Sequence, residues 1–305
     1  MALLLVLAVA CRGGSDGAGE AISIVVTTNI LGDVVEQVVG EDAEVEVLMP
    51  AGVDPHEYQA SSQQVAALAK ADLVVANGLG LEEGLVDALE AAESDGVNVF
   101  EVAPLLSPIG FGDGACEPEV GHGHGHDEVG GCDPHVWMDP LRMADAARLV
   151  AAELETISGG GLWESRAGDY AAELTAADGE IEQLMAVVPA GRRRLVTNHD
   201  TLGYFAARYG FEVIGTVVPG GSTLGEPSSE ELAALVEVIR QEGVSVIFAE
   251  TIEPATLAEA VASELDAPVD VVELHTDSLG ESGTDADTLI GMLVANARLI
   301  ADALG

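Results

Sequence analysis

The stretch Trp163–Val188, WESRAGDYAAELTAADGEIEQLMAVV, carries the longest periodic pattern of the chain and decides how its two halves are connected. Its apolar residues recur at alternating steps of four and three, which places them in one stripe along one face of a helix. The stripe consists of Trp163, Ala167, Tyr170, Leu174, Ala177, Ile181, Leu184 and Val188. We predict a single helix roughly 40 Å long. Such a helix can join two lobes as a strut, or it can present its stripe to a coiled-coil partner.

Short apolar runs that alternate with amphipathic segments flank this helix on both sides. Runs of β-branched or alternating apolar residues of this length are typical of strands. Those before the helix are Ile22–Thr28, Ala43–Met49, Leu73–Ala76 and Val97–Val102. Those after it are Arg194–Asn198, Phe211–Val218, Val244–Glu250 and Val269–Leu274. Strands that alternate with helices indicate parallel α/β sheets, and a set on each side of the helix indicates two lobes.

The expected architecture is therefore an α/β fold with two parallel-sheet lobes joined by one long rigid helix. We assign residues 22–160 to the N-terminal lobe, 161–189 to the connecting helix and 190–305 to the C-terminal lobe. Folds of this kind bind ligands at the carboxyl ends of their strands. We accordingly expect the ligand site in the cleft between the lobes.

Residues 1–21 have the composition of an export signal. The apolar run Ala2–Ala10 is too short to span a bilayer but fits the core of a signal peptide. Cys11 follows small residues and precedes a stretch rich in Gly, Ser and Asp, which resembles the processing site of bacterial lipoproteins. We interpret 1–21 as signal peptide, lipidation site and tether of an exported protein, anchored on the outer side of the membrane or periplasmic. The alternative is a frayed apolar N-terminus.

The charge balance excludes one class of partner. The chain has 53 acidic and 11 basic residues, a net charge of −42, and Lys70 is its single lysine. Nucleic-acid binding requires a basic surface, so we expect no nucleic-acid partner. A solvated acidic surface, typical of adaptation to salt, accounts for the excess better than a specific funnel for cations.

A tract of alternating histidine and glycine lies in the region assigned to the N-terminal lobe. His122, His124 and His126 have the composition of a metal-binding segment, and we expect an auxiliary metal-collecting loop. Cys116 and Cys132 flank this tract. In an oxidising compartment they can form a disulfide, which for a loop of this length is worth roughly 3 kcal/mol in the chain-entropy model. The competing interpretation is a thiolate metal site shared with the histidines.

Four further residues follow expected strands or stand in the loops after them. They are His56, His135, His199 and Asp277, two from each half of the chain. Three neutral imidazoles and one carboxylate form a closed set that suits tetrahedral zinc. Manganese prefers more oxygen ligands, so the imidazole of His199 favours zinc.

Each of these residues also has a simpler interpretation. His56 can be an ordinary loop residue, His199 can cap a helix, and Asp277 can cap a turn. His275 would face the same side of an extended segment as Asp277 and can replace it as a ligand. Glu250, at the end of an expected strand, is either a hydrogen-bond partner of a ligand or a solvated carboxylate.

Long motifs surround these candidates. They are AGVDPHEYQAS at His56, DPHVWMDP at His135, TNHDTLGYFAARYG at His199, and FAETIEP with LHTDSLG in the second half. From Ile22 to the end, the chain resembles the solute-binding receptors of bacterial ABC importers for zinc and manganese. The resemblance implies His56, His135, His199 and Asp277 as metal ligands and the long helix as a rigid connector. It also implies that the His-rich segment is the loop of the zinc branch. Manganese members usually carry a glutamate at the position of His199, so the histidine there also resembles the zinc branch.

The resemblance implies a monomeric receptor, not an enzyme, that captures Zn²⁺ outside the cytoplasm and delivers it to an ABC permease. Mn²⁺ or Fe²⁺ as cargo is the alternative within this class. From other classes, three histidines with an open fourth position would suit an exported zinc hydrolase. Asp277 can close that position, and the chain has neither an HExxH motif nor a Ser-His nucleophile arrangement. An adhesin role is neither supported nor excluded by the sequence.

Overall fold

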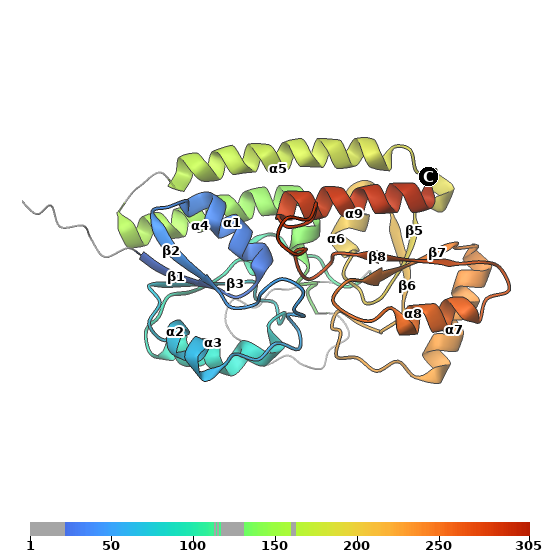
Figure 1. Ribbon diagram of the computed structural model, residues 1–305, viewed down its shortest axis with the longest axis horizontal. Helices are drawn as coiled ribbons and strands as arrows, with labels where there is room; N and C mark the ends of the chain where they lie inside the picture. Colours follow the sequence, from blue (N-terminus) through green and yellow to red (C-terminus); the bar gives the residue numbers. More distant parts are fainter. Residues whose placement is uncertain (1–21, 113, 115, 117–130, 160–162) are drawn as a thin grey trace, which may run out of the picture.

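The structure, a computed structural model, describes residues 22–112, 114, 116, 131–159 and 163–305. Within these ranges the chain forms two lobes side by side, with one long helix lying across both (Figure 1). The expected lipidation site Cys11 and the tract histidines His122, His124 and His126 lie outside the described residues. In the described ranges, no helix combines the length and the apolar character needed to cross a membrane.

The N-terminal lobe is built on a four-stranded parallel sheet with the strand order β2-β1-β3-β4. Its strands are β1 (Ile22–Val26), β2 (Ala43–Val47), β3 (Leu73–Ala76) and β4 (Val99–Glu101). Helices α1 (Asn29–Val39) and α4 (Pro140–Ser158) cover one face of the sheet, and α2 (Ser62–Leu68) and α3 (Val86–Ser94) cover the other (Figure 1). The continuous apolar run of β3 is buried on both faces, as expected for an inner parallel strand.

The C-terminal lobe repeats this plan with the strand order β6-β5-β7-β8, again parallel throughout. Its strands are β5 (Arg194–Thr197), β6 (Glu212–Thr216), β7 (Val246–Glu250) and β8 (Asp270–Leu274). Helices α6 (Gly203–Tyr209) and α9 (Leu289–Leu304) lie on the side of the long helix, and α7 (Ser229–Glu242) and α8 (Thr256–Ser263) cover the other face. The two-lobed parallel α/β fold predicted from the sequence is therefore confirmed.

Local sequence sets where several helices begin. Ser61 and Ser228 precede α2 and α7, and each side chain accepts a hydrogen bond from a backbone N–H in the first turn. The third helical residue in each case, Gln64 or Glu231, accepts in return from the backbone N–H of the cap, which completes a capping box. Pro140 opens α4, where its fixed φ is already helical.

The connecting helix α5 (Trp163–Met185) buries the predicted stripe against its own chain. It packs on α4 and α1 over the N-terminal lobe and on α9 over the C-terminal lobe, which fits the strut and not a coiled-coil partner (Figure 1). The helix ends at Met185, before the predicted end at Val188. Pro189 disfavours a helical residue before it, and the guanidinium of Arg193 donates to the carbonyl oxygens of Met185 (2.8 Å) and Val188 (3.2 Å).

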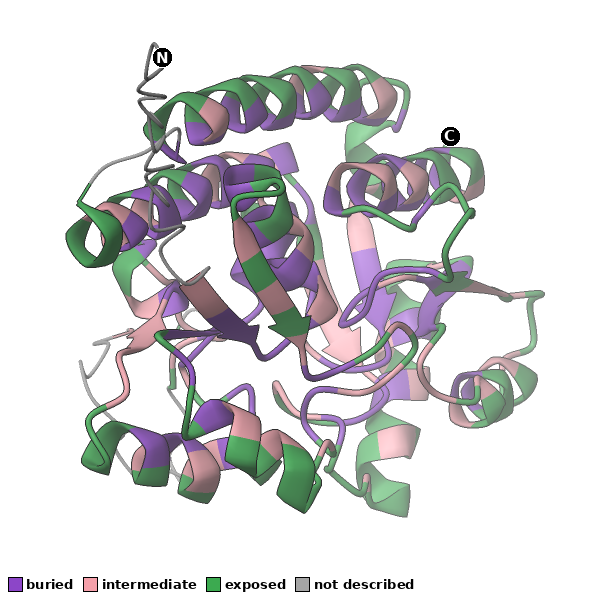
Figure 2. Cartoon of the chain, turned by 60° about the vertical axis from the view of Figure 1, so that its left-hand side comes forward, coloured by how far each residue is buried: buried purple, intermediate pink, exposed green. Residues whose placement is uncertain are grey.

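One hydrophobic core runs through both lobes beneath α5. It includes Ile24 of the first sheet and Phe248 of the second, connected through the buried stripe of α5. Separate clusters lie on the far faces of the sheets, under α2 and α3 and under α7 and α8. Figure 2 shows the buried sides of the helices facing the sheets and the exposed sides facing solvent. The lobes are therefore joined by shared packing as well as by the chain.

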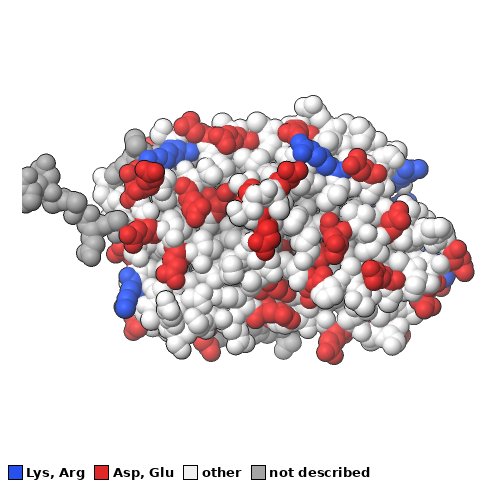
Figure 3. All heavy atoms as spheres, in the orientation of Figure 1, with Lys and Arg blue, Asp and Glu red and all other residues white. Residues whose placement is uncertain are grey.

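Carboxylates are common on the face of the molecule shown in Figure 3. They are scattered over both lobes there, with few basic side chains among them. On this face the distribution matches the solvated acidic surface expected from the composition.

Candidate metal centre

The structure brings together the four candidate ligands that were predicted from the sequence. His56 lies in the loop after β2, His135 precedes α4 by one short turn, His199 follows β5, and Asp277 follows β8. One potential ligand atom from each lies within 4.8 Å of the others, and all four residues are buried. Two residues come from each lobe, and three of the four stand after the carboxyl ends of parallel strands. The cluster therefore lies between the lobes.

The ligand atoms converge on one small region. Nε2 of His199 is 3.2 Å from Nε2 of His135 and 3.3 Å from Oδ2 of Asp277. Nε2 of His56 is 3.8 Å from Oδ2 of Asp277, and Nε2 of His135 is 3.9 Å from its Oδ1. Three imidazole nitrogens and a carboxylate that face one another in a water-poor site form the donor set of a divalent metal site.

Two of the three histidines are oriented by a carboxylate of their own lobe. Nδ1 of His135 lies 2.7 Å from Asp133 Oδ1, which also accepts from the backbone N–H of His135 (2.9 Å). Nδ1 of His199 lies 2.6 Å from Oε1 of Glu250, at the end of β7. A carboxylate on Nδ1 fixes the tautomer and directs the lone pair of Nε2 into the cluster. Glu250 is thus a hydrogen-bond partner of a candidate ligand and not a solvated group.

Burial and charge have opposite effects on these groups. Burial lowers the pKa of His135 well below its ordinary value, aided by the neighbouring imidazoles. Burial also lowers the pKa of His199, but Glu250 and Asp277 outweigh it and raise that pKa to about 10. Burial raises the pKa of Asp277 to about 6, against the opposing effect of His199. A proton and a metal ion therefore compete for His199 at neutral pH.

The residues on either side of Asp277 are held from the opposite lobe. The indole N–H of Trp137 donates to the carbonyl oxygen of Thr276 (2.6 Å). Asn29 donates to the hydroxyl of Ser278 (2.9 Å) and accepts from the backbone N–H of Leu279 (2.9 Å). Both Trp137 and Asn29 belong to the N-terminal lobe. Contacts across the cleft thus hold the residues on either side of Asp277, while its carboxylate accepts from the hydroxyl of Thr201 in its own lobe (3.3 Å).

His56 differs from the other two histidines. Its backbone N–H donates to Asp54 Oδ1 (2.8 Å), but neither ring nitrogen has a hydrogen-bond partner among the described residues. Nδ1 lies 3.6 Å from Oε1 of Glu83, beyond hydrogen-bond distance. A buried polar group without a partner costs about 1–3 kcal/mol. A metal ion bound at Nε2 would satisfy one of these nitrogens.

From the sequence, His275 was an alternative to Asp277 as the fourth ligand. In the structure Asp277 belongs to the cluster and His275 does not. His275 is half-buried, its Nδ1 lies 3.2 Å from the hydroxyl of Thr251, and it is not part of the cluster. Sequence analysis missed the role of Asp133. The signal was available, because an aspartate two residues before a histidine can accept its backbone N–H in a tight turn.

A disulfide joins Cys116 to Cys132, with the two Cα atoms 4.8 Å apart. Of the two interpretations of these cysteines, the structure has the disulfide and not a thiolate metal site. Cys132 also forms an isolated bridge with Gly110, and the N–H of Asp133 donates to the carbonyl oxygen of Ile109 (2.8 Å). The cross-link therefore stands immediately before the turn that carries His135.

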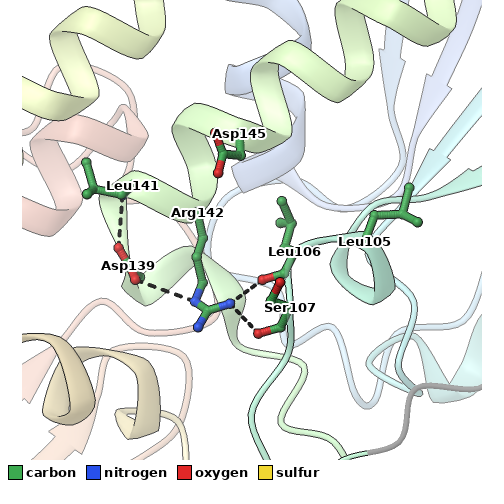
Figure 4. Close-up of a pocket in the computed structure, with 7 residues that line it drawn as sticks. All are labelled: Leu105, Leu106, Ser107, Asp139, Leu141, Arg142 and Asp145. Atoms are coloured by element: carbon green, nitrogen blue, oxygen red, sulfur yellow. Dashed lines mark hydrogen bonds and ion pairs between the residues drawn. The ribbon is translucent and has the colours of Figure 1, made fainter.

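The segment before the disulfide is anchored to α4 (Figure 4). Arg142 donates to the carbonyl oxygens of Leu106 and Ser107. Its guanidinium lies 4.8 Å from the centre of the Tyr204 ring, and the hydroxyl of Tyr204 donates to the carbonyl oxygen of Asp133 (2.7 Å). The pocket in Figure 4 is lined by none of the four candidate ligands. Its residues contribute to the support of the His135 turn.

Comparison with known proteins agrees with this geometry. The family model described as zinc-uptake complex component A, periplasmic, matches residues 24–303. The chain belongs to this family. The zinc-binding protein TroA of Treponema pallidum is 32% identical over 301 residues, which cover 96% of this chain and 92% of TroA. A solved structure of that periplasmic protein superposes with a TM-score of 0.80 at 31% identity, covering 94% of this chain and all of the chain in that structure.

Other relatives have names that specify manganese. The manganese-binding lipoprotein MntA of Halalkalibacterium halodurans is 28% identical over 93% of this chain and 88% of its own length. The manganese ABC transporter substrate-binding lipoprotein PsaA of Streptococcus anginosus is 27% identical over 99% of this chain and 96% of its own length. The family assignment confirms the class predicted from the sequence: a metal-binding substrate-binding protein of an ABC transporter, not an enzyme. The names do not agree on one metal.

Proposed function

We propose that this chain binds Zn²⁺ at His56, His135, His199 and Asp277 outside the cytoplasm and delivers it to an ABC permease. The observation that carries the proposal is the cluster itself, in which three imidazole nitrogens and one carboxylate face one another in a buried site. The cargo ion would be held by four protein groups, and no fifth protein donor is required for tetrahedral coordination.

The choice of zinc rests on the donor set. Three nitrogen ligands and one carboxylate suit zinc, whereas manganese favours sites richer in oxygen. His199 is the position that matters most, because its imidazole is the third nitrogen donor. The description of the family model, a zinc-uptake component, supports the same choice. A closed set of four protein ligands also argues against the zinc hydrolase considered above, since hydrolysis needs an open position for water.

We further propose the division of labour along the chain that the sequence suggested. Residues 1–21 export the protein, and Cys11 carries a lipid that keeps it at the outer side of the membrane. Residues 22–160 and 190–305 form the two lobes, which 161–189 connects. The lipoprotein names of several relatives support this arrangement. The Gly121–His126 tract collects zinc weakly near the cleft, and its deletion would then reduce uptake when zinc is scarce.

Native mass spectrometry with elemental analysis tests the cargo and its site together. Protein purified without added metal should hold one zinc ion per chain, and His199→Ala should lose it. The matched control is His275→Ala, which removes a histidine of the same lobe that lies outside the cluster. Manganese or iron in the native protein would overturn the zinc assignment. Zinc retained by His199→Ala would place the ion outside the cluster, and the histidine tract would be the next site to test.

A further inference from the structure

The loop between β6 and α7 belongs to the C-terminal lobe but contacts the His56 region of the N-terminal lobe. The hydroxyl of Thr223 donates to Asp54 Oδ2 (2.6 Å), and the hydroxyl of Ser222 donates to Glu83 Oε1 (2.6 Å). We call these two hydrogen bonds the inter-lobe latch. Thr223 is buried, so water has little access to its bond with the carboxylate. Hydrogen bonds to an ionised group in such surroundings are among the strong ones.

The latch reaches a candidate ligand through a single residue. Asp54 accepts from the backbone N–H of His56 with Oδ1 (2.8 Å) and from Thr223 with Oδ2. One carboxylate therefore connects the C-terminal lobe to the turn that carries His56. The same loop is also attached to its own side of the site, because the carbonyl oxygen of Gly220 accepts from the N–H of Asp200, next to His199 (3.0 Å).

The loop fits its position closely. A Cβ atom on Gly221 would lie 1.9 Å from the ring of Phe111, and Gly220 has a φ of +95°. No side chain fits at Gly221 without displacing the Phe111 ring, and the backbone at Gly220 favours glycine. Phe111 belongs to the segment before the disulfide, in the N-terminal lobe. Packing thus independently supports the seating of this loop across the cleft.

Within the described residues, the side chain of His56 has no hydrogen bond, and only its backbone N–H is held by Asp54. His135 and His199 each have a carboxylate on Nδ1, whereas both ring nitrogens of His56 are buried without a hydrogen bond. The position of His56 therefore depends on its turn, and the turn depends on Asp54. Separating the lobes would break the bond from Thr223 to Asp54 and release that turn from the C-terminal lobe.

We propose that Thr223 is a positioning residue for metal retention. Through Asp54 it holds His56 in the cluster, and the inter-lobe latch must open before the metal can leave. The latch then governs the rate of dissociation more than the rate of capture. This inference rests on the proposed function only in that the cluster binds a divalent metal, and it holds for zinc and manganese alike.

The test measures Zn²⁺ release from the full chain. Zinc-loaded protein is mixed in a stopped-flow instrument with an excess of a chromogenic chelator, and the dissociation rate is recorded. Thr223→Val keeps the shape of the side chain and removes the donor, so release should be about tenfold faster, as expected for loss of one hydrogen bond to a charged group. Thr223→Ser restores the hydroxyl and should release zinc within about twofold of the native rate.

The matched control is Thr175→Val, the same chemical change at an exposed position of α5 whose hydroxyl bonds only its own helix. Its release rate should equal that of the native protein. The association rate of zinc should change by less than about twofold in all variants, because the latch acts on dissociation. A variant with a damaged fold would change the association rate as well. If Thr223→Val does not fold, Ser222→Ala is measured instead: faster release supports the latch, and native release overturns it.

The outcomes separate this inference from the function on which it rests. If the native chain binds no zinc at the cluster, the proposed function fails. If the native chain binds zinc and Thr223→Val releases it at the native rate, the latch is wrong and the function stands. If Thr223→Ser accelerates release as much as Thr223→Val, the hydroxyl is not the cause, and the inference is also overturned.

Discussion

The tripeptide Asp-Pro-His occurs twice, at residues 54–56 and 133–135, and the two copies hold their histidines differently. In both, an aspartate Oδ1 accepts the backbone N–H of the histidine, at 2.8 Å and 2.9 Å. In the second copy the same oxygen also orients the ring, since it lies 2.7 Å from Nδ1 of His135. In the first copy the free oxygen of Asp54 instead accepts from Thr223 of the other lobe. The tripeptide sets the turn in both copies, but only in the second does its aspartate also hold the ring of the histidine.

The difference extends to all four candidate ligands. His135 and His199 are oriented by Asp133 and Glu250 of their own lobes, so the ring of each is held without a contact from the opposite lobe. The carboxylate of Asp277 also has a partner in its own lobe, since the hydroxyl of Thr201 donates to Oδ1 (3.3 Å). His56 is the exception, because its ring has no hydrogen bond and its turn is tied through Asp54 to Thr223 of the opposite lobe.

The largest effects should come from removing one ligand of each kind. Structural zinc sites bind with about 10–16 kcal/mol shared among four ligands, so loss of one costs roughly 2.5–4 kcal/mol. His135→Ala should therefore weaken Zn²⁺ binding nearly a thousandfold, and His56→Ala, which removes a ring without an orienting hydrogen bond, about a hundredfold. Competition with a chelator of known affinity measures both. Equal losses would mean that the hydrogen bond of the ring does not decide how much a ligand contributes.

An intermediate loss of zinc affinity should follow from neutralising a carboxylate that orients the ring of a candidate ligand. Asp133→Asn keeps an acceptor for the turn and for Nδ1 of His135 but removes the charge that makes the imidazole a better donor. Loss of such partners costs 10–100-fold in metal affinity, and we expect about tenfold for this conservative change. Glu250→Gln is the parallel variant for His199. Zinc titration of both variants should show similar losses; native affinity in both would mean that ring orientation is set by packing alone.

The smallest effect should be a proton released on binding. Glu250 and Asp277 raise the pKa of His199 to about 10, above its value in an unfolded chain, so at pH 7.5 the metal-free protein holds this proton and zinc must displace it. Calorimetry in buffers of different ionisation enthalpy should show about one proton released per zinc. Apparent affinity should rise as pH rises towards 10. In Glu250→Gln the pKa of His199 falls, and the released fraction should fall with it. Equal release in both proteins would contradict this origin.

Much of the fold followed from the sequence because its signals are local. Apolar runs such as Val246–Glu250 are continuous, and the stripe of α5 repeats over most of its length. The end of α5 was predicted too late. The long stripe continues to Val188, but Pro189 and the guanidinium of Arg193 end the helix at Met185, and only the first of these is a local signal.

Three of the candidate ligands could be predicted because they stand after strand ends, and all four because they lie in long motifs. Apart from the local bond of Asp133 to His135, most of their support could not be predicted, because it is made by residues distant in sequence. Trp137 donates to Thr276 across 139 positions, and Thr223 reaches Asp54 across 169. Nothing near Thr223 in the sequence indicates a partner, since a Gly-, Ser- and Thr-rich loop looks the same whether it is exposed or seated on another lobe.

The core that runs under α5 makes the two lobes one cooperative unit of folding. Ile24, Phe248 and the buried stripe of α5 belong to the same cluster, so the apolar layer beneath α5 is shared between the lobes. Local opening free energies tend to follow such units, so the amides that exchange most slowly with solvent should come from β1 and β7 together. A receptor built this way can loosen the loops around its cargo while its interior stays closed to water.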